Sequence, residues 1–216
     1  MPHAISLGVG EPDFDTPWHV RSEGIRSLEK GRTFYTSNSG LIELRQEICK
    51  WYQRKYNVLY DYKTEALLTV GGSEGIDVAL RAMLDPGDEV IIPEPCYVSY
   101  VPCVQLIGAV PVTIELKNEN QFRLTPEELL AAITDKTKIL ILAFPSNPTG
   151  AVMTKEDLEP IAKICQEKDI YVISDEIYSE LTYGGQKHCS ISSLPGMKDR
   201  TIVINGFSKA YAMTGW

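Results

Sequence analysis

The sequence predicts an α/β fold in which a mostly parallel β-sheet is flanked by helices. Two observations carry this prediction. From about residue 64 onward, short apolar runs such as KILILAF (138–144) alternate with amphipathic segments such as SEGIDVALRAML (73–84). Polar, Gly-rich or Pro-rich segments come directly after the apolar runs. Strands that are buried on both faces of a parallel sheet are nearly continuously apolar, and helices connect them.

Local signals place the individual elements. The apolar residues of SEGIDVALRAML repeat at helical spacing, and DPGD (85–88) ends that helix. Thr125 and Glu128 predict a capping box around Pro126, and Thr154 begins a helix that runs to about Lys168. The expected strands are 67–70, 89–95, 110–116, 138–144, 171–176 and 201–206, and further helices are expected at about 17–30 and 41–56.

The first forty residues differ from the rest. Two loop-like stretches, LGVGEPDFDTP (7–17) and GRTFYTSNSG (31–40), surround one short amphipathic segment. We therefore expect residues 1–40 to form an N-terminal arm together with part of a smaller domain, which leads into the sheet. Residues 41–216 are expected to form the large domain.

Composition narrows the function classes. A net charge of -8 gives no basic field for nucleic acid. The sequence has no apolar run of the roughly 18–20 residues that a membrane helix needs, and its N-terminus does not have the pattern of a signal peptide. The five cysteines include no C-x-x-C pair and the three histidines are scattered, so we expect reduced thiols, a cytoplasmic protein and no metal site.

The segments after the strands carry the candidate chemistry, because ligands of parallel sheets bind beyond the carboxyl ends of the strands. Gly72 and Ser73 begin a helix, where free backbone N–H groups can hold a phosphate, although Gly-Gly before a helix is more often a tight turn. Asp175 ends an apolar run, where it is either a helix cap or a partner for a cation. Lys209 follows another strand, although most lysines are solvated surface charges. Asn147 would ordinarily be a turn residue.

These residue types together suit one ligand. An anion cradle, a carboxylate, a lysine, a stacking ring at Tyr97 and polar donors at Asn147 and Tyr178 are what a phosphorylated pyridine aldehyde requires. Such a cofactor accepts electrons, while the protein supplies orientation and electrostatics.

Three motifs carry a resemblance to a known family. The segments GFSKAYAMTGW (206–216), SNPTG (146–150) and SDEIY (174–178) occur in this order and spacing. With them the chain resembles, from about Ser6 to Trp216, the class I/II aminotransferases of pyridoxal-phosphate (PLP) fold type I, in the aspartate/aromatic aminotransferase-like branch. The resemblance implies a PLP-dependent transfer of an amino group from an L-amino acid to a 2-oxo acid.

The resemblance also implies residue roles. Lys209 would bind the cofactor as an aldimine and act as the catalytic base, and Asp175 would pair with the pyridine nitrogen. Asn147 and Tyr178 would hydrogen-bond the phenolic oxygen, and Tyr97 would stack on the ring. The phosphate would be held by Gly72, Ser73, the Glu74 backbone and Ser208, and by Tyr35 of a neighbouring subunit, which implies a homodimer. Gly10 would contact the substrate.

The chain departs from the family pattern at two places. A phosphate-binding serine often lies three residues before the lysine, where this chain has Gly206. In the family an arginine that pairs with the phosphate follows the tryptophan equivalent to Trp216, and a C-terminal small domain comes later. We therefore expect a piece of a longer protein, with an incomplete large domain and little transaminase activity on its own.

Other functions compete with transamination. A PLP-dependent C–S β-lyase, or a related synthase, shares the lysine, aspartate and asparagine. A transcription regulator can use the same fold as a ligand domain, but such proteins carry a basic DNA-binding domain upstream. A plain α/β module without PLP would make the residues at the strand ends coincidental. The sequence does not specify the donor amino acid, and it permits aspartate, aromatic or alanine-type substrates.

Overall fold

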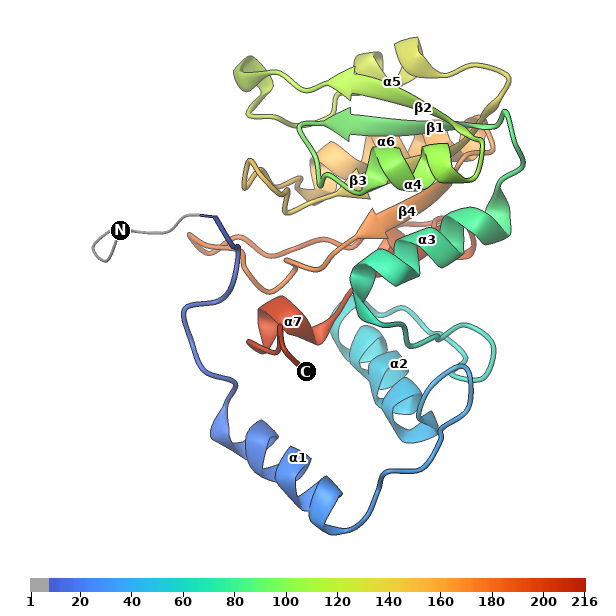
Figure 1. The fold of residues 1–216 in the computed structure, drawn as a ribbon. Coiled ribbons are helices and arrows are strands. Elements are labelled where there is room, and N and C mark those ends of the chain that lie inside the picture. Colours follow the sequence, from blue (N-terminus) through green and yellow to red (C-terminus); the bar gives the residue numbers. More distant parts are fainter. Residues whose placement is uncertain (1–7) are drawn as a thin grey trace.

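A five-stranded parallel sheet forms the centre of the protein. The computed structural model describes residues 8–216 (Figure 1), so the first seven residues of the predicted arm lie outside the described residues. The sheet order is β2-β1-β3-β4-β5, and every neighbouring pair is parallel. The strands are β1 (Glu89–Glu94), β2 (Val110–Glu115), β3 (Thr137–Ala143), β4 (Tyr171–Asp175) and β5 (Thr201–Ile204). Five of the six predicted strands and the α/β class are thus confirmed.

The side chains of the central strands alternate between two cores. In β3, Leu140 packs into one apolar cluster and Ile141 into the other. In β4, Val172 and Ile173 divide in the same way. This alternation follows from the two-residue period of a strand. Because both faces are buried, these strands are continuously apolar in the sequence, and the period is hidden there.

Helices cover both faces of the sheet. Helices α3 (Gly71–Met83) and α4 (Tyr100–Leu106) contribute to one core, while α5 (Pro126–Ala132) and α6 (Lys155–Glu167) contribute to the other (Figure 1). Both predicted helix starts are confirmed, since Thr125 caps α5 and Thr154 caps α6 in capping boxes. Helix α4 was not predicted, because it is short and contains Pro102.

The strand predicted at 67–70 is wrong. Its backbone bonds to a loop instead of to a neighbouring strand: the Leu68 N–H donates to the Ser39 carbonyl at 3.1 Å. The Gly71 N–H donates back to the Thr69 carbonyl at 3.0 Å, which closes a turn before α3. An apolar run becomes a strand only when a partner strand accepts its hydrogen bonds, and local sequence does not report that partner.

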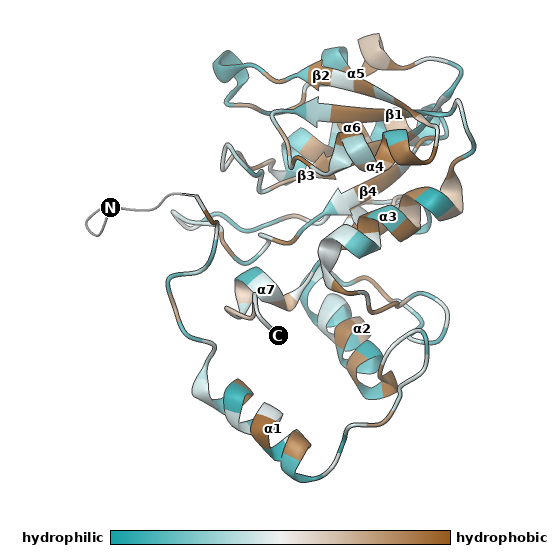
Figure 2. Cartoon of the chain, in the orientation of Figure 1, coloured by the Kyte–Doolittle hydropathy of each residue, from teal (hydrophilic) through white to brown (hydrophobic). Residues whose placement is uncertain are grey.

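Two helices precede the sheet. Helix α1 (Trp18–Glu29) and helix α2 (Ile42–Tyr56) agree with the predicted ranges. Figure 1 shows α1 standing apart from the sheet, and none of its residues is buried, although Figure 2 shows apolar residues along it. Helix α2 buries Tyr52 and Arg45. Across residues 8–216 no helix is long and apolar enough to span a membrane.

Short helical turns complete the chain. They are the 3-10 turns η1 (Asn118–Asn120), η2 (Ile191–Ser193) and η3 (Lys198–Arg200), and helix α7 (Phe207–Ala210), which follows β5. Helix α7 carries Lys209 close to the carboxyl end of the sheet.

Candidate active site

The predicted site residues come from segments that start at one edge of the sheet. In the strand register, Asp175 lies opposite Ala143 of β3 on one side and opposite Ile204 of β5 on the other. The segments that contain Asn147, Tyr178 and Lys209 therefore leave the sheet close together. Parallel pairing is what converts three distant motifs into neighbours.

Asp175 is held on the face of β4 that carries α3 and α4. Its Oδ2 accepts a hydrogen bond from the Tyr100 hydroxyl at 2.7 Å, and its Oδ1 accepts one from the Ile177 N–H at 3.1 Å. Burial raises the pKa of the Asp175 carboxyl, while these two hydrogen bonds oppose the rise. A cationic partner at this carboxylate would favour its ionised form.

Lys209 lies between the sheet edge and the N-terminal arm. Its ammonium group donates to the Gly10 carbonyl and lies 6.0 Å from the centre of the Tyr178 ring. The Trp216 indole N–H donates to the Thr16 hydroxyl at 3.0 Å, which fastens the same segment to the arm. The structure thus brings Gly10 and Tyr178, two of the predicted site residues, to the lysine.

Tyr97 and Tyr178 each contact another predicted site residue. The Tyr97 hydroxyl is 3.4 Å from the Ser73 hydroxyl, and hydrogen bonds with Ser73 and Ser99 lower the pKa of Tyr97. Burial raises the pKa of Tyr178, and a side-chain hydrogen bond with Asn147 opposes that rise. Among the predicted site residues, Ser73 is therefore in contact with Tyr97, and Asn147 with Tyr178.

The residues predicted to form the anion cradle lie in the first turn of α3. Gly72 and Ser73 lie in this turn, where backbone N–H groups have no acceptor within the helix. A Cβ at Gly72 would meet Ile204 at 3.4 Å, so the helix start packs closely on the end of β5. The Glu74 carboxylate accepts a hydrogen bond from the Val70 N–H, directly before the helix. The Glu74 side chain is thereby directed at the backbone of its own turn.

Tyr35 and Ser208, two further predicted phosphate contacts, lie in different surroundings. Tyr35 is fully exposed in the loop between α1 and α2, away from the strand ends. Ser208 lies in α7 beside Lys209. At position 206, a Cβ would approach the Ile177 side chain to 2.9 Å, so the site has no room for a serine there without a shift.

Three polar residues near the site were not predicted. Tyr100 binds Asp175, Glu176 is fully buried directly after it, and Asn205 binds the turn before Lys209. Tyr97 lies before α4, which begins at Tyr100, so helical spacing gave no signal for Tyr100. Glu176 and Asn205 had no local signal either, because their contacts are with segments elsewhere in the chain.

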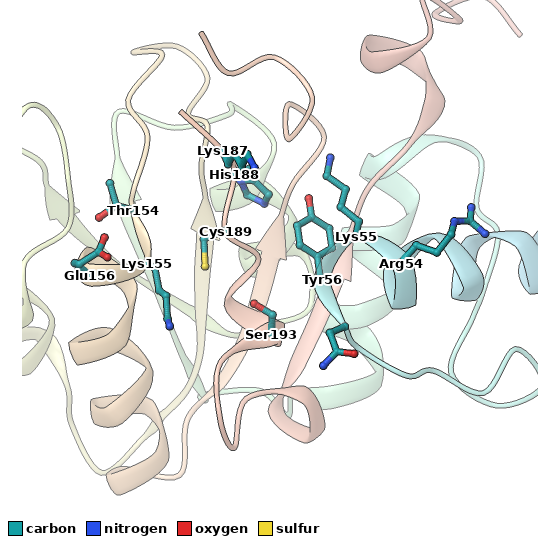
Figure 3. A pocket seen from close by; sticks show the side chains of 11 residues that line it. Arg54, Lys55, Tyr56, Thr154, Lys155, Glu156, Lys187, His188, Cys189 and Ser193 are labelled. Carbon is teal, nitrogen blue, oxygen red and sulfur yellow. The ribbon is translucent and has the colours of Figure 1, made fainter. Parts of the chain in front are cut away.

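A separate cavity of ≈ 540 Å³ lies among α2, the start of α6 and the segment 187–193 (Figure 3). Its lining includes Lys55, Lys155, Lys187 and His188, and no predicted cofactor residue. It is therefore distinct from the strand-end site. Within residues 8–216 no cluster of three or more His, Cys, Asp or Glu side chains could hold a metal ion.

Comparison with known proteins defines the class. The family described as aminotransferase class I and II matches residues 2–216, and the chain belongs to that family. It is 48% identical over its whole length to an aspartate aminotransferase of Pyrococcus abyssi, covering 56% of that protein. It is 47% identical to aromatic-amino-acid aminotransferase 2 of Thermococcus litoralis, over 98% of this chain and 54% of that protein.

A solved structure agrees in fold. The aromatic aminotransferase of Pyrococcus horikoshii superposes with a TM-score of 0.97 at 48% identity, over 100% of this chain and 58% of that one. The chain thus spans about half the length of the relatives it matches.

Proposed function

We propose that the protein is a PLP-dependent aminotransferase that moves an amino group from an L-amino acid to a 2-oxo acid. The observation that carries the proposal is the common edge of the parallel sheet from which these segments start. Asp175 ends β4 opposite Ile204, Lys209 follows β5 in α7, and Gly72 in the first turn of α3 lies next to Ile204. Its membership in a family of aminotransferases supports the same reaction.

The residues present fit PLP. Asp175 keeps lone pairs for a ring N–H beyond its bonds to Tyr100 and Ile177. Asn147 and Tyr178 would bind the phenolic oxygen, and Tyr97 would lie on the ring. The phosphate would be held by the first turn of α3 with Gly72, Ser73 and the Glu74 backbone, and by Ser208. When bound, PLP would act as the electron acceptor for the substrate Cα.

The side chains then have separate tasks. Asp175 would hold a proton on the ring nitrogen, because a carboxylate favours a nearby cation. Lys209 would remove the proton from the substrate Cα and return it on the other side of the transfer, as a positioned general base and acid. Its bond to the Gly10 carbonyl would be given up when substrate arrives, which places Gly10 beside the reacting atoms.

Substrate and assembly follow the relatives. We propose an aspartate-like or aromatic amino acid as donor, the two substrates that the relatives' names state. The complete enzyme would be a homodimer in which Tyr35 of one subunit approaches the phosphate of the other, and the full exposure of Tyr35 suits that contact. Residues 1–40 would serve as arm and small-domain segment, and residues 41–216 as the PLP-binding domain. A cytoplasmic location suits its five free thiols.

Covalent trapping tests the proposal. Borohydride reduction in the presence of PLP should fix the cofactor on Lys209, as read by mass spectrometry of the peptide. Lys209→Ala should remove this adduct, whereas Lys187→Ala, which changes a lysine of the separate cavity, should leave it unchanged. Labelling that persists in Lys209→Ala would refute the assignment. Product analysis of the full gene product then separates transamination, which yields a new amino acid, from a β-lyase, which yields ammonia and pyruvate.

A further inference from the structure

Glu176 is a charged residue that the proposed reaction does not use. It follows Asp175 at the end of β4, and its side chain is 0% exposed. Removing a carboxylate from water costs several kcal/mol unless partners compensate, and neutral or apolar replacements of buried charges often stabilise a protein. A buried carboxylate beside the candidate cofactor site therefore suggests a task other than stability.

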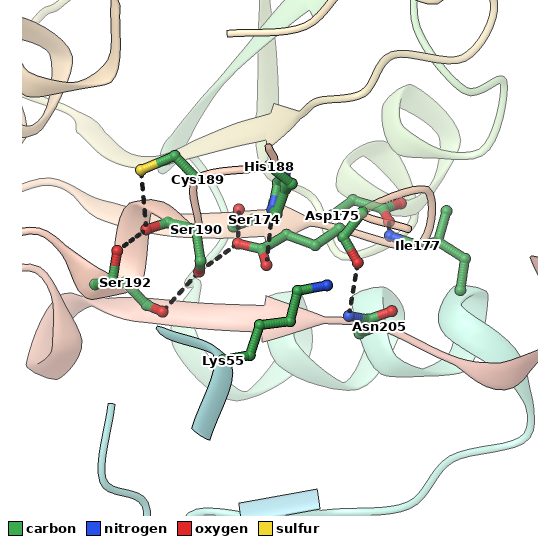
Figure 4. Close-up of polar contacts among 12 residues, drawn as sticks. Lys55, Ser174, Asp175, Ile177, His188, Cys189, Ser190, Ser192 and Asn205 are labelled. Carbon is green, nitrogen blue, oxygen red and sulfur yellow. Dashed lines mark hydrogen bonds and ion pairs between the residues drawn. The ribbon is translucent and has the colours of Figure 1, made fainter. Parts of the chain in front are cut away.

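The Glu176 carboxylate has polar partners on one side of the sheet (Figure 4). Its Oε1 accepts hydrogen bonds from Ser190 at 2.6 Å and from Ser174 at 3.0 Å. Its Oε2 lies 3.1 Å from the Nε2 atom of His188, whose side chain is 7% exposed. Both of these atoms are buried, and no hydrogen bond joins them. Two hydroxyl groups therefore fix the carboxylate.

The backbone of Glu176 joins the two strands that lead to Asp175 and Lys209. Its N–H donates to the Ile204 carbonyl at 2.8 Å, at the end of β5. Residue 205 then binds the next turn, because the side-chain Oδ1 of Asn205 accepts a hydrogen bond from the Gly206 N–H at 2.8 Å. Glu176 is thus the neighbour of Asp175 in the sequence, and its backbone is bonded to the end of β5, shortly before Lys209.

The pleat of β4 sends neighbouring side chains to opposite faces. Ser174 and Glu176 face the core of α6 and η2, whereas Asp175 faces Tyr100 and α4. The hydrogen bonds of Ser174 and Glu176 on the α6 face fix the residues on both sides of Asp175. The Asp175 side chain is thereby directed to the opposite face, towards the strand-end site.

We propose that Glu176 is a positioning residue for Asp175, and that its buried charge adds to the negative potential which holds a cationic ring nitrogen there. The inference rests on the proposed function for its ligand. Its mechanism is electrostatic as well as geometric: the Glu176 charge acts on Asp175 across the end of the sheet, and only Asp175 would touch the cofactor.

Other titratable groups surround both carboxylates. Those that face Asp175 are Tyr97, Tyr100 and Tyr178, and those that face Glu176 are Tyr52, Tyr56, Tyr60, His188 and Cys189. Burial is the first cause that raises the pKa of Asp175, and the Glu176 charge raises it further. Removing that charge should therefore let Asp175 ionise at lower pH.

Glu176→Gln in the full gene product tests the inference, because glutamine keeps the shape and removes the charge. The control is Glu180→Gln, which removes an equal charge from a partly exposed carboxylate paired with Lys55. The titration of Asp175 is followed in the cofactor-free protein by the NMR signal of its carboxyl carbon, which Asp175→Asn assigns. The midpoint of this titration should move to lower pH in Glu176→Gln and should not move in Glu180→Gln. A purely structural role for Glu176 would leave this titration where it is, and that result would overturn the proposal.

Cofactor affinity is the second readout. The dissociation constant of PLP, measured by fluorescence titration, should rise about tenfold in Glu176→Gln. Loss of a residue that supports a metal ligand lowers metal affinity by about ten- to a hundredfold, and the lower end of that range is expected here. It should stay unchanged in Glu180→Gln. Equal affinity of Glu176→Gln and the natural protein would also overturn the proposal.

Ser190→Ala covers the case in which Glu176→Gln does not fold. It keeps the charge and removes one of the two hydroxyl donors to the carboxylate, together with the Ser190–Ser192 hydrogen bond. It should weaken PLP binding about fivefold, as one net hydrogen bond predicts, and unchanged binding would count against positioning. Failure of the proposed function would look different: the natural protein itself would not bind PLP, while the Asp175 titration would still decide the role of Glu176.

Discussion

Two helices of nearly equal length, α6 and α1, differ in how much of their surface is buried. Helix α6 begins in a capping box and buries Leu158 and Ile161, which are 3% and 0% exposed. Helix α1 has no side-chain cap and buries none of its residues, and Trp18 and Leu28 remain 66% and 67% exposed. An amphipathic pattern predicts a helix in both cases, but only α6 has an apolar surface to cover it within the described chain.

This difference indicates that the sheet and its flanking helices contribute most of the stability of the protein. Residues of the sheet and its flanking helices form the two apolar clusters, whereas the arm is held mainly at its ends. Thr16 and Gly10 bind the segment of Lys209 and Trp216, and α1 spans the distance between these contacts and α2. We expect substitutions to separate the two regions by the size of their effect on unfolding.

The largest effect is expected in the sheet. Leu140→Ala in β3 empties a fully buried position between β1 and β4, and should lower the free energy of unfolding by about 2–5 kcal/mol. Urea denaturation measures it. Leu140→Ile keeps the volume and should cost less than about 1.5 kcal/mol. Equal losses for the two variants would mean that this core is not closely packed.

A smaller effect is expected at the cap of α6. The Thr154 hydroxyl accepts a hydrogen bond from the Asp157 N–H, and Thr154→Ala should cost about 1 kcal/mol. The matched change in the arm, Thr33→Ala, alters an exposed loop and should leave the urea midpoint in place. If Thr33→Ala were as costly, the arm would be part of the cooperative core.

The junction of the two regions should respond locally. Trp216→Phe removes the indole donor to Thr16, which is worth about 0.5–1.5 kcal/mol in a typical hydrogen bond. We expect faster limited proteolysis within residues 8–16 and an unchanged urea midpoint. Trp18→Phe, which alters an exposed side chain of α1, should change neither quantity. A lower midpoint in Trp216→Phe would show that the arm unfolds together with the sheet.

The smallest effect is expected on α1 itself. Leu28→Ala removes an exposed leucine and should stay within about 0.5 kcal/mol in this chain, as surface substitutions usually do. A loss comparable to that of Leu140→Ala would contradict the comparison from which these predictions start.

The sequence was most informative where a signal is local. Strands β1 to β5 were predicted because each contains a short, mainly apolar run. The start of α5 was predicted because Thr125 and Glu128 form a capping-box pattern, and the start of α6 because Thr154 opens an amphipathic segment. The error at 67–70 has the opposite cause, since an apolar run does not reveal whether a strand lies beside it. Hydrogen bonding to Ser39 had to be seen in the structure.

The candidate site shows the same division. Asp175, Asn147 and Lys209 were predicted as site residues because each lies at or after the end of a strand and belongs to a recognisable motif. Tyr100 and Glu176 were missed because their partners, Asp175 and Ser190, lie 75 and 14 residues away. Motifs identify the groups that meet a ligand, whereas the groups that hold them from behind depend on packing.

The contact between the arm and the Lys209 segment has a consequence for the synthesis of the chain. Thr16 and Trp216 are separated by 200 residues, and Gly10 and Lys209 by 199. At about 5–20 residues added per second, the ribosome needs roughly 10–40 s to make the second member of each pair after the first. During that interval the arm has no segment to bind. The contacts of the arm therefore form only after the strands of the sheet have been made, and they cannot guide the folding of the sheet.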